Sequence, residues 1–177
     1  MVTPAAAERF LAAPWLVDVE PDLRHAVLGV LAEGRAEAGT NLLEQGRPND
    51  HITFLIDGAV TVERAFADGR VETVAALNAP TVFGETSFFR SRPPIVTVRA
   101  VAPAWFLTLD HPAHDRLRRD NLRAAEALAL AAVRVLAERF DLLDRRLSDY
   151  IAQHPDGPSR ANEWSRFRAR LFEEQNL

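Results

Sequence analysis

The spacing of apolar positions changes twice along the chain and divides it into three regions. Residues 4–34 follow a helical period, in which Pro21 and Asp22 open a run that Gly34 closes. A helix commonly begins near a proline and ends near a glycine, so we predict helices before residue 35. The apolar side chains that share one face of this run are Leu23, Ala26, Val27, Val30 and Leu31.

From about residue 35 to residue 110 the pattern is that of β-strands. Short apolar runs alternate with turn residues, and these runs read NLLEQ, ITFLI, AVTVERAF, VETVAAL, IVTVRAV and WFLTL. Asp57-Gly58 and Asp68-Gly69 each lie between two such runs, which predicts two β-hairpins. Many short strands at this spacing indicate an antiparallel barrel or jelly roll.

A long helix is predicted after the strands. The segment Asn121–Gln153 contains neither glycine nor proline, and its apolar side chains recur at alternating spacings of 4 and 3 residues, which is a heptad repeat. This row predicts a seam with a second copy of the chain, and a second row can pack on the barrel. The alternative is a single amphipathic helix on its own domain. The first row is Ala129, Val133, Leu136, Phe140, Leu143, Leu147 and Tyr150; the second is Leu128, Val135 and Leu142.

These patterns predict a mixed α+β protein. Its fold class is an antiparallel β jelly roll or barrel with N-terminal helices, a short helix within the β region and a long C-terminal helix. We expect one domain at residues 10–152, with its β core at about 35–110 and its long helix at about 121–152. After the break at His154–Pro158, a short helical tail is expected to complete residues 153–177.

Composition excludes several kinds of site. The chain has no cysteine, which excludes disulfides, thiolate zinc sites, cysteine-held iron–sulfur clusters and thiol catalysis. Its 21 basic residues are all arginine and face 25 acidic ones, and a net charge of −4 does not favour general nucleic-acid binding. No apolar run approaches the length of a membrane span, and the N-terminus lacks a basic leader. We expect a soluble, cytoplasmic protein without membrane contact.

The segment FGETSFFRSRPPIVTVRA, residues 83–100, carries the candidate site. Gly84 permits close approach of the backbone to a ligand, and the first amides of a short helix starting there are free donors for an anion. The carboxylate of Glu85 beside them can accept hydrogen bonds from sugar hydroxyls. The alternative is that this glycine forms only a turn before a short helix.

Catalysis and metal binding have little support in the sequence. Ser87 and Ser91 have no recognisable base partner, and the glutamates form no acid and base pair at a known spacing. The histidines His51, His111 and His114 fall short of a metal-ligand pattern. We therefore expect neither an enzyme nor a metal centre.

At this segment the chain resembles the cyclic-nucleotide-binding domain family of catabolite-activator-type regulators and kinase regulatory subunits, over about residues 10–150. The family's cassette reads F-G-E and later P-R-A-A-T-V-x-A, and this chain has Phe83-Gly84-Glu85 and then PPIVTVRA at residues 93–100. The order of helix, barrel and long helix also agrees. Glycines agree at the family's turn positions, which are Gly39, Gly46, Gly58, Gly69 and Gly84.

The resemblance implies a role for each matching residue. Glu85 matches the carboxylate that binds the ribose 2′-hydroxyl. Gly84, Thr86 and Ser87 match the backbone that approaches the ribose and the cyclic phosphate, and Val96 and Thr97 match the strand on the other side of the pocket. The implied ligand is cyclic AMP or cyclic GMP, with no other cofactor. The implied ligand-binding set is Phe83, Gly84, Glu85, Thr86, Ser87, Val96 and Thr97.

Three positions depart from the family pattern. The arginine that pairs with the cyclic phosphate falls on Pro94, which offers neither a charge nor an N–H. The small residue after it falls on Ile95, and the Gly-Asp before the cassette falls on Pro80-Thr81. Arg92, two positions before Pro94, is the candidate replacement for the missing cation, with Arg90 as a second. The alternative for both is a solvent-facing arginine on a loop.

Two functions follow from these observations. The first is a regulatory ligand-binding module that signals through a homodimer formed by Asn121–Gln153. The alternative is a degenerate pseudo-sensor that serves as a dimerisation or protein-docking domain without binding cyclic nucleotide. Activator-type relatives carry a winged helix-turn-helix after the long helix, and about 25 residues follow Ile151 here. We therefore expect no direct specific DNA binding, and regulation through a separate protein partner.

Overall fold

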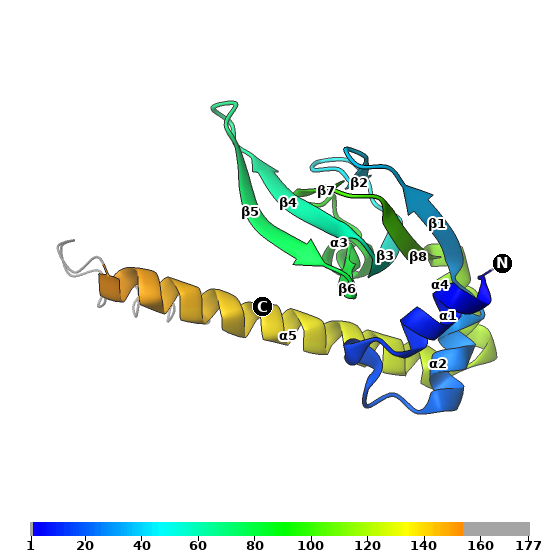
Figure 1. Ribbon diagram of the computed structural model, residues 1–177. Coiled ribbons are helices and arrows are strands. Elements are labelled where there is room, and N and C mark those ends of the chain that lie inside the picture. Colours follow the sequence, from blue (N-terminus) through cyan, green and yellow to red (C-terminus); the bar gives the residue numbers. More distant parts are fainter. Residues whose placement is uncertain (1, 154–177) are drawn as a thin grey trace. The chain divides into compact units, whose positions relative to one another are not determined.

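The computed structural model describes residues 2–153, so the expected tail after Gln153 lies outside the described residues (Figure 1). Within them, three helical segments precede eight strands, a short helix α3 interrupts the strands, and α4 and α5 follow. The bounds are α1 Pro4–Leu11, η1 Pro14–Leu16, α2 Pro21–Leu28, β1 Ala32–Ala36, β2 Asn41–Leu43, β3 His51–Asp57, β4 Ala59–Ala65, β5 Val71–Asn78, β6 Thr81–Phe83, α3 Glu85–Arg90, β7 Thr97–Ala100, β8 Ala104–Asp110, α4 His111–Asp120 and α5 Leu122–Gln153.

The strands form two antiparallel sheets, which confirms the predicted fold class. One sheet has the order β1-β8-β3-β6 and the other the order β2-β7-β4-β5. Between them lies an apolar group that we call the interior cluster. It consists of the buried residues Leu43, Leu55, Val60, Phe83, Val98, Ala100 and Ala104.

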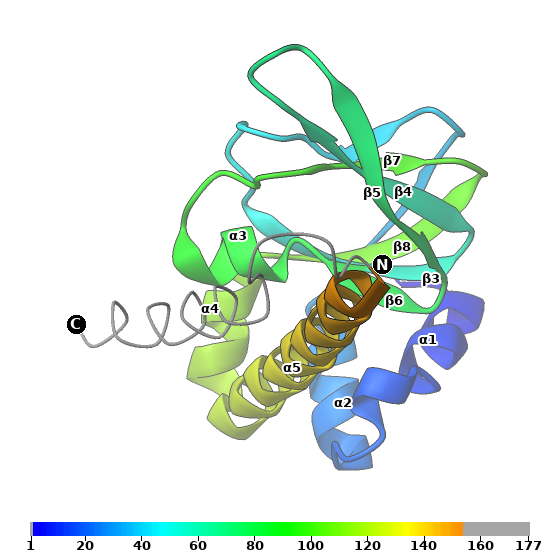
Figure 2. The same cartoon turned by 90° about the vertical axis from the view of Figure 1, so that its left-hand side faces the viewer.

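Helices cover the other face of the first sheet, as Figure 2 shows for α1, α2 and α4. Side chains of β3 alternate between the two faces. Ile52 and Phe54 pack with the helices, whereas Leu55 belongs to the interior cluster. Burial on both faces explains why the run ITFLI is apolar almost throughout.

The N-terminal helices are confirmed, but the predicted end of the second is wrong. The helix α2 ends at Leu28, and β1 begins at Ala32, inside the run read as helical. Gly34 lies within β1 opposite Phe106 of β8 and does not close a helix. A Cβ atom at Gly34 would lie 2.5 Å from the Phe106 ring, so the glycine provides room for that side chain.

Of the two predicted hairpins, one is confirmed and one is wrong. Asp68-Gly69 joins the paired strands β4 and β5. Asp57-Gly58 instead carries the chain from one sheet to the other, because β3 pairs with β6 and β8 and β4 pairs with β5 and β7. Gly58 has φ +95°, and a side chain there would meet the Pro103 carbonyl. Glycine is therefore required where the chain crosses tightly from one sheet to the other.

The predicted long helix is confirmed as α5, which the Asn121 side chain caps by accepting a hydrogen bond from the Ala124 amide at 3.1 Å. The chain divides into two compact units, Met1–Val135 and Leu136–Leu177. The division falls within α5, and the boundary expected between residues 152 and 153 stays a prediction. None of the described helices is long and apolar enough to cross a membrane.

Two sides of α5 differ within the first unit. Leu128 is buried and Val135 is partly buried, and both pack with the helix-side core of the first sheet. Val133, from the heptad row, is 59% exposed. In the second unit, Phe140 and Leu143 of the same row are also exposed. Leu128 and Val135 of the second row thus pack on the domain as predicted, whereas Leu142 of the same row is 44% exposed, and the seam with a second copy stays a prediction.

Candidate functional site

The candidate site begins where β6 leads into α3. The predicted short helix is confirmed at Glu85–Arg90, directly after Gly84. Gly84 has φ +87°, and a Cβ atom there would lie 2.9 Å from the His51 carbonyl oxygen. Both the backbone conformation and the close approach of β3 therefore require glycine at this position.

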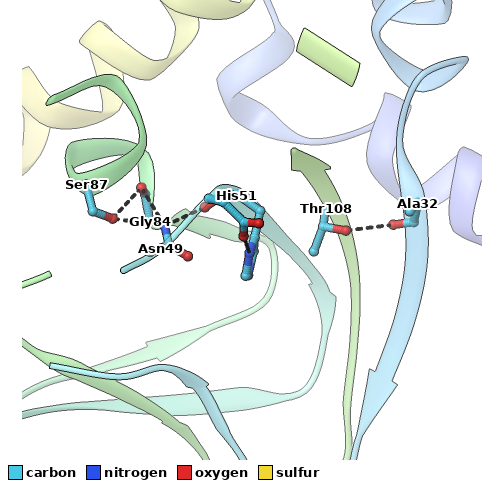
Figure 3. A network of polar contacts seen from close by, with 7 residues as sticks. Ala32, Asn49, His51, Gly84, Ser87 and Thr108 are labelled. Carbon is cyan, nitrogen blue, oxygen red and sulfur yellow. Dashed lines mark hydrogen bonds and ion pairs between the residues drawn. The ribbon is translucent and has the colours of Figure 1, made fainter. Parts of the chain in front are cut away.

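Asn49 connects this turn to the start of β3, a role that was not predicted from the sequence. Its Nδ2 donates to the His51 carbonyl at 2.7 Å and to Ser87 Oγ at 2.9 Å, and it lies 3.4 Å from the Gly84 carbonyl (Figure 3). Ser87 Oγ in turn donates to the Gly84 carbonyl at 3.0 Å. An asparagine before a strand is an ordinary turn signal, so the sequence contains no local sign of these partners.

The two side chains that flank Gly84 are both buried. Phe83 belongs to the interior cluster. Glu85 is 3% exposed and is the only buried charged side chain among residues 2–149, whose side chains are described. A buried carboxylate can accept strong hydrogen bonds from hydroxyl groups that reach it. Thr86 is exposed, so only its backbone belongs to this turn.

The predicted site residues Val96 and Thr97, at the start of β7, make different contacts. Val96 packs against the interior cluster, to which Val98 also belongs. Thr97 Oγ1 accepts a hydrogen bond from the Gln45 amide at 3.1 Å, and the Arg99 side chain pairs with Glu63 at 3.3 Å. Strand alternation places these two residues on the other face from Val98. The structure therefore brings Phe83 and Val96 to the interior, and a ligand contact by Thr97 stays a prediction.

Pro94 is buried, and its carbonyl oxygen accepts a hydrogen bond from the Gly46 amide at 2.9 Å. Ile95, the next residue, is 69% exposed. The side chains of Arg90 and Arg92 are exposed as well. The backbone amide of Arg92 donates to the Ser87 carbonyl at 3.3 Å and helps to end α3. A role of Arg92 as replacement cation stays a prediction.

The short helix α3 lies near α4 in Figure 2, and aromatic rings of the two helices are in contact. The Phe88 ring lies parallel to His111, with the ring centroids 4.0 Å apart. His114 meets Phe88 and Phe89 edge-on. Burial lowers the pKa of His114, and the nearby charge of Arg118 lowers it further. Residues 2–153 contain no cluster of histidine and carboxylate side chains that could hold a metal ion.

Comparison with known proteins identifies the family. The model of the cyclic nucleotide-binding domain matches residues 33–121, and the chain therefore belongs to this family. Over 133 residues it is 26% identical to a CRP-like cAMP-activated global transcriptional regulator of Mycobacterium tuberculosis. That match covers 75% of this chain, and the chain spans 58% of the length of that relative.

Solved structures share the fold. A cyclic nucleotide-binding domain from Methylobacillus flagellatus superposes with a TM-score of 0.74 at 21% identity, over 82% of this chain and 84% of that one. A cAMP-binding acyltransferase from Mycobacterium smegmatis superposes with a TM-score of 0.53 at 27% identity, over 64% of this chain and 38% of that one. The proteins similar to this chain thus include a transcriptional regulator and an acyltransferase, and the match covers only part of each.

Proposed function

We propose that this chain is a regulatory ligand-binding module whose nucleotide-like ligand binds beside Glu85. The observation that carries the proposal is the buried carboxylate at the first position of α3, directly after the glycine that the cassette requires. The ligand lies between this turn and Val96, with Phe83 behind it. The backbone of Gly84, Thr86 and Ser87 forms its near wall. The chain has no catalytic activity of its own in this proposal.

The ligand acts through the contact between α3 and α4. Phe88 is 1% exposed and stacks on His111, so a shift of α3 displaces the start of α4. Only one residue, Asn121, lies between α4 and α5, so the displacement of α4 is transmitted to α5. A ligand changes this arrangement only if it binds two positions of α3 with different affinities.

The output of the module is a homodimer through α5. Its heptad row leaves Val133, Phe140 and Leu143 exposed, each by 59% or more. Apolar side chains at this spacing are buried when two such helices pair. A separate protein partner recognises the dimer. Direct DNA binding is not part of the proposal. Since the Mycobacterium tuberculosis relative is named a transcriptional regulator, we place the chain in the cytoplasm.

Calorimetric titration of the full chain with cyclic AMP and cyclic GMP tests the ligand site. We expect saturable binding that Glu85→Gln weakens about 10-fold or more, because loss of a charge-assisted hydrogen bond costs about 1.5–3 kcal/mol. Glu37→Gln is the matched control, since Glu37 is exposed on the loop between β1 and β2. Equal binding by the wild type and Glu85→Gln would contradict this site.

A pseudo-sensor is the second candidate, favoured by the buried proline at position 94. In this case the domain dimerises or docks a partner without ligand. Restoring an arginine as Pro94→Arg tests it, because a regained charge pair is worth about 3–5 kcal/mol, or about 100-fold or more in affinity. A variant that gains this affinity for cyclic AMP retains an intact pocket. A folded variant that binds neither cyclic nucleotide supports the pseudo-sensor.

A further inference from the structure

The last turns of α5 expose part of an apolar face. The heptad row continues there with Leu143, Leu147 and Tyr150, which we call the α5 end row. Leu143 is 62% exposed, and Leu147 is partly buried. An apolar row at helical spacing that is not buried in its own domain is typical of a surface that packs on another helix.

The sequence after α5 contains a second apolar row. It consists of Trp164, Phe167 and Leu171, which we call the tail row, and their spacing of 3 and 4 residues places them on one face of a helix. Pro155–Pro158 breaks the helical pattern between the two rows, and Ser159 is a typical N-terminal cap. Residues 154–177 lie outside the described residues, so the tail row is a feature of the sequence.

The two rows match each other if the chain reverses its direction at the break. Counted away from the break, both rows have a step of 3 residues followed by a step of 4. Two antiparallel helices rise equally, by about 1.5 Å per residue, so residues that lie level are equally far from the point of reversal. Every level pair of the two rows is centred on Gly157, which lies within the break and suits a reversal of the chain. These pairs are Tyr150 with Trp164, Leu147 with Phe167, and Leu143 with Leu171.

The charges beside the rows do not oppose this register. On one side of the apolar rows, Asp144 comes near Arg168, which has the opposite charge; on the other side, Arg146 comes near Arg170, which has the same charge. Charge pairs at a surface contribute only about 0.2–1 kcal/mol each, so the two effects nearly cancel and apolar burial decides. The last turns of α5 and the residues after them also belong to one compact unit, Leu136–Leu177.

We propose that residues 159–171 dock as a helix on the α5 end row of the same chain, antiparallel to α5. The docked tail covers Leu143 and Leu147, which also belong to the heptad row of the proposed dimer. One apolar face cannot pack on two helices in the same way at once, so the tail competes with a second copy of the chain for this part of α5. The competition rests on the proposed function, whereas the docking does not.

Pairs of introduced cysteines test the docking directly, because the chain has no cysteine of its own. The full-length double variant Leu143→Cys with Leu171→Cys places two thiols at one level and keeps the other two level pairs. We expect air oxidation of a dilute solution to form a disulfide within one chain, seen as a faster monomer band on a non-reducing gel. Leu143→Cys with Ala169→Cys is the matched control, because Ala169 falls on the opposite face of the tail helix. Its disulfide should form at least about 10-fold more slowly.

Equal rates in the two double variants, or a disulfide between two chains in the first, would overturn the docking and leave the proposed function in place. A second measurement tests the competition. Phe167→Glu places a charge in the tail row and uncovers the α5 end row, so sedimentation should show a dimer dissociation constant about 10-fold lower than that of the wild type or less. Ala169→Glu is the control and should leave this constant unchanged. An unchanged constant in Phe167→Glu overturns the competition, and a Phe167→Glu chain that stays monomeric at all concentrations overturns the proposed dimer instead.

Discussion

The side-chain amide of Asn49 donates a hydrogen bond to Ser87 Oγ at 2.9 Å, which joins the loop before β3 to the first turn of α3. The same nitrogen donates to the His51 carbonyl, and the Ser87 hydroxyl donates a hydrogen bond to the Gly84 carbonyl. The Ser87 hydroxyl is therefore hydrogen-bonded within the protein. We expect Ser87 to contact a ligand through its backbone. Asn49 thus holds the first turn of α3 beside the start of β3.

Replacement of Asn49 by alanine should loosen α3. The change leaves Ser87 Oγ and the His51 carbonyl without this donor, and each lost hydrogen bond costs about 0.5–1.5 kcal/mol, so we expect a loss of about 1–2 kcal/mol in the free energy of unfolding. Urea denaturation measures this loss, and hydrogen exchange should speed up at the Phe88 amide, which bonds to the Gly84 carbonyl. The control is Asn78→Ala, an exposed asparagine at the end of β5. Equal effects of the two changes would contradict the role of Asn49.

Two glycines with similar backbone angles allow the close approach at Gly84 to be measured separately. Gly84 and Gly69 have φ +87° and +84°, but only Gly84 has atoms within 4 Å of the position of an added Cβ. Gly69→Ala should cost about 1 kcal/mol, from the backbone conformation alone. Gly84→Ala should cost about 1–2 kcal/mol more, because the His51 carbonyl must move. Chemical denaturation gives both values, and an equal cost would show that β3 tolerates a side chain there.

Local signals sufficed for much of the fold and for part of the site. The turn at Gly84, the short helix after it and the long helix from about Asn121 each depend on a few neighbouring residues, and each was predicted correctly. Strand β1 was missed because Gly34 is a typical helix-ending residue in the sequence. Its actual role depends on Phe106, which pairs with it across the sheet. The intrinsic secondary-structure propensity of a residue carries no information about a partner that is distant in the sequence.

The crossing at Asp57-Gly58 and the contacts of Asn49 were missed for a related reason. An Asp-Gly step favours a tight turn, but whether the strands that it joins pair with each other is decided by the rest of the sheet. Gly58 lies against Pro103, and Asn49 reaches Ser87, each across a long stretch of chain. Thr97 was assigned to the pocket by resemblance; its hydroxyl oxygen accepts a hydrogen bond from the Gln45 amide, and a contact with a ligand stays a prediction.

Acid should weaken the contact between α3 and α4 through His114. Its pKa is lowered from the ordinary value of 6.5, first by burial and then by the charge of Arg118, although Asp115 opposes this effect. The unfolded chain therefore binds this proton more readily than the folded chain. The stabilisation is fully present above about pH 6.5 and is lost as the pH falls below it through the lowered folded-state pKa.

The variant His114→Phe removes this titration and keeps a ring beside Phe88 and Phe89. Between about pH 7.5 and pH 5.5, we expect the wild type to lose more unfolding free energy than His114→Phe, as measured by urea denaturation at each pH. His25→Gln is the control, because His25 is exposed on α2. Parallel pH profiles for the wild type and His114→Phe would show that His114 does not contribute.

The exposed heptad row of α5 should control association. Phe140 is 59% exposed, and in a paired helix its ring would be buried in the seam, so Phe140→Glu should place a charge at the centre of the contact. We expect this variant to sediment as a monomer at concentrations at which the wild type is a dimer, with a dissociation constant raised about 100-fold or more. Arg145→Glu places the same charge outside the heptad row and should leave the dimer intact. A wild type that is monomeric at all concentrations, or a dimer that tolerates Phe140→Glu, would exclude α5 as the interface.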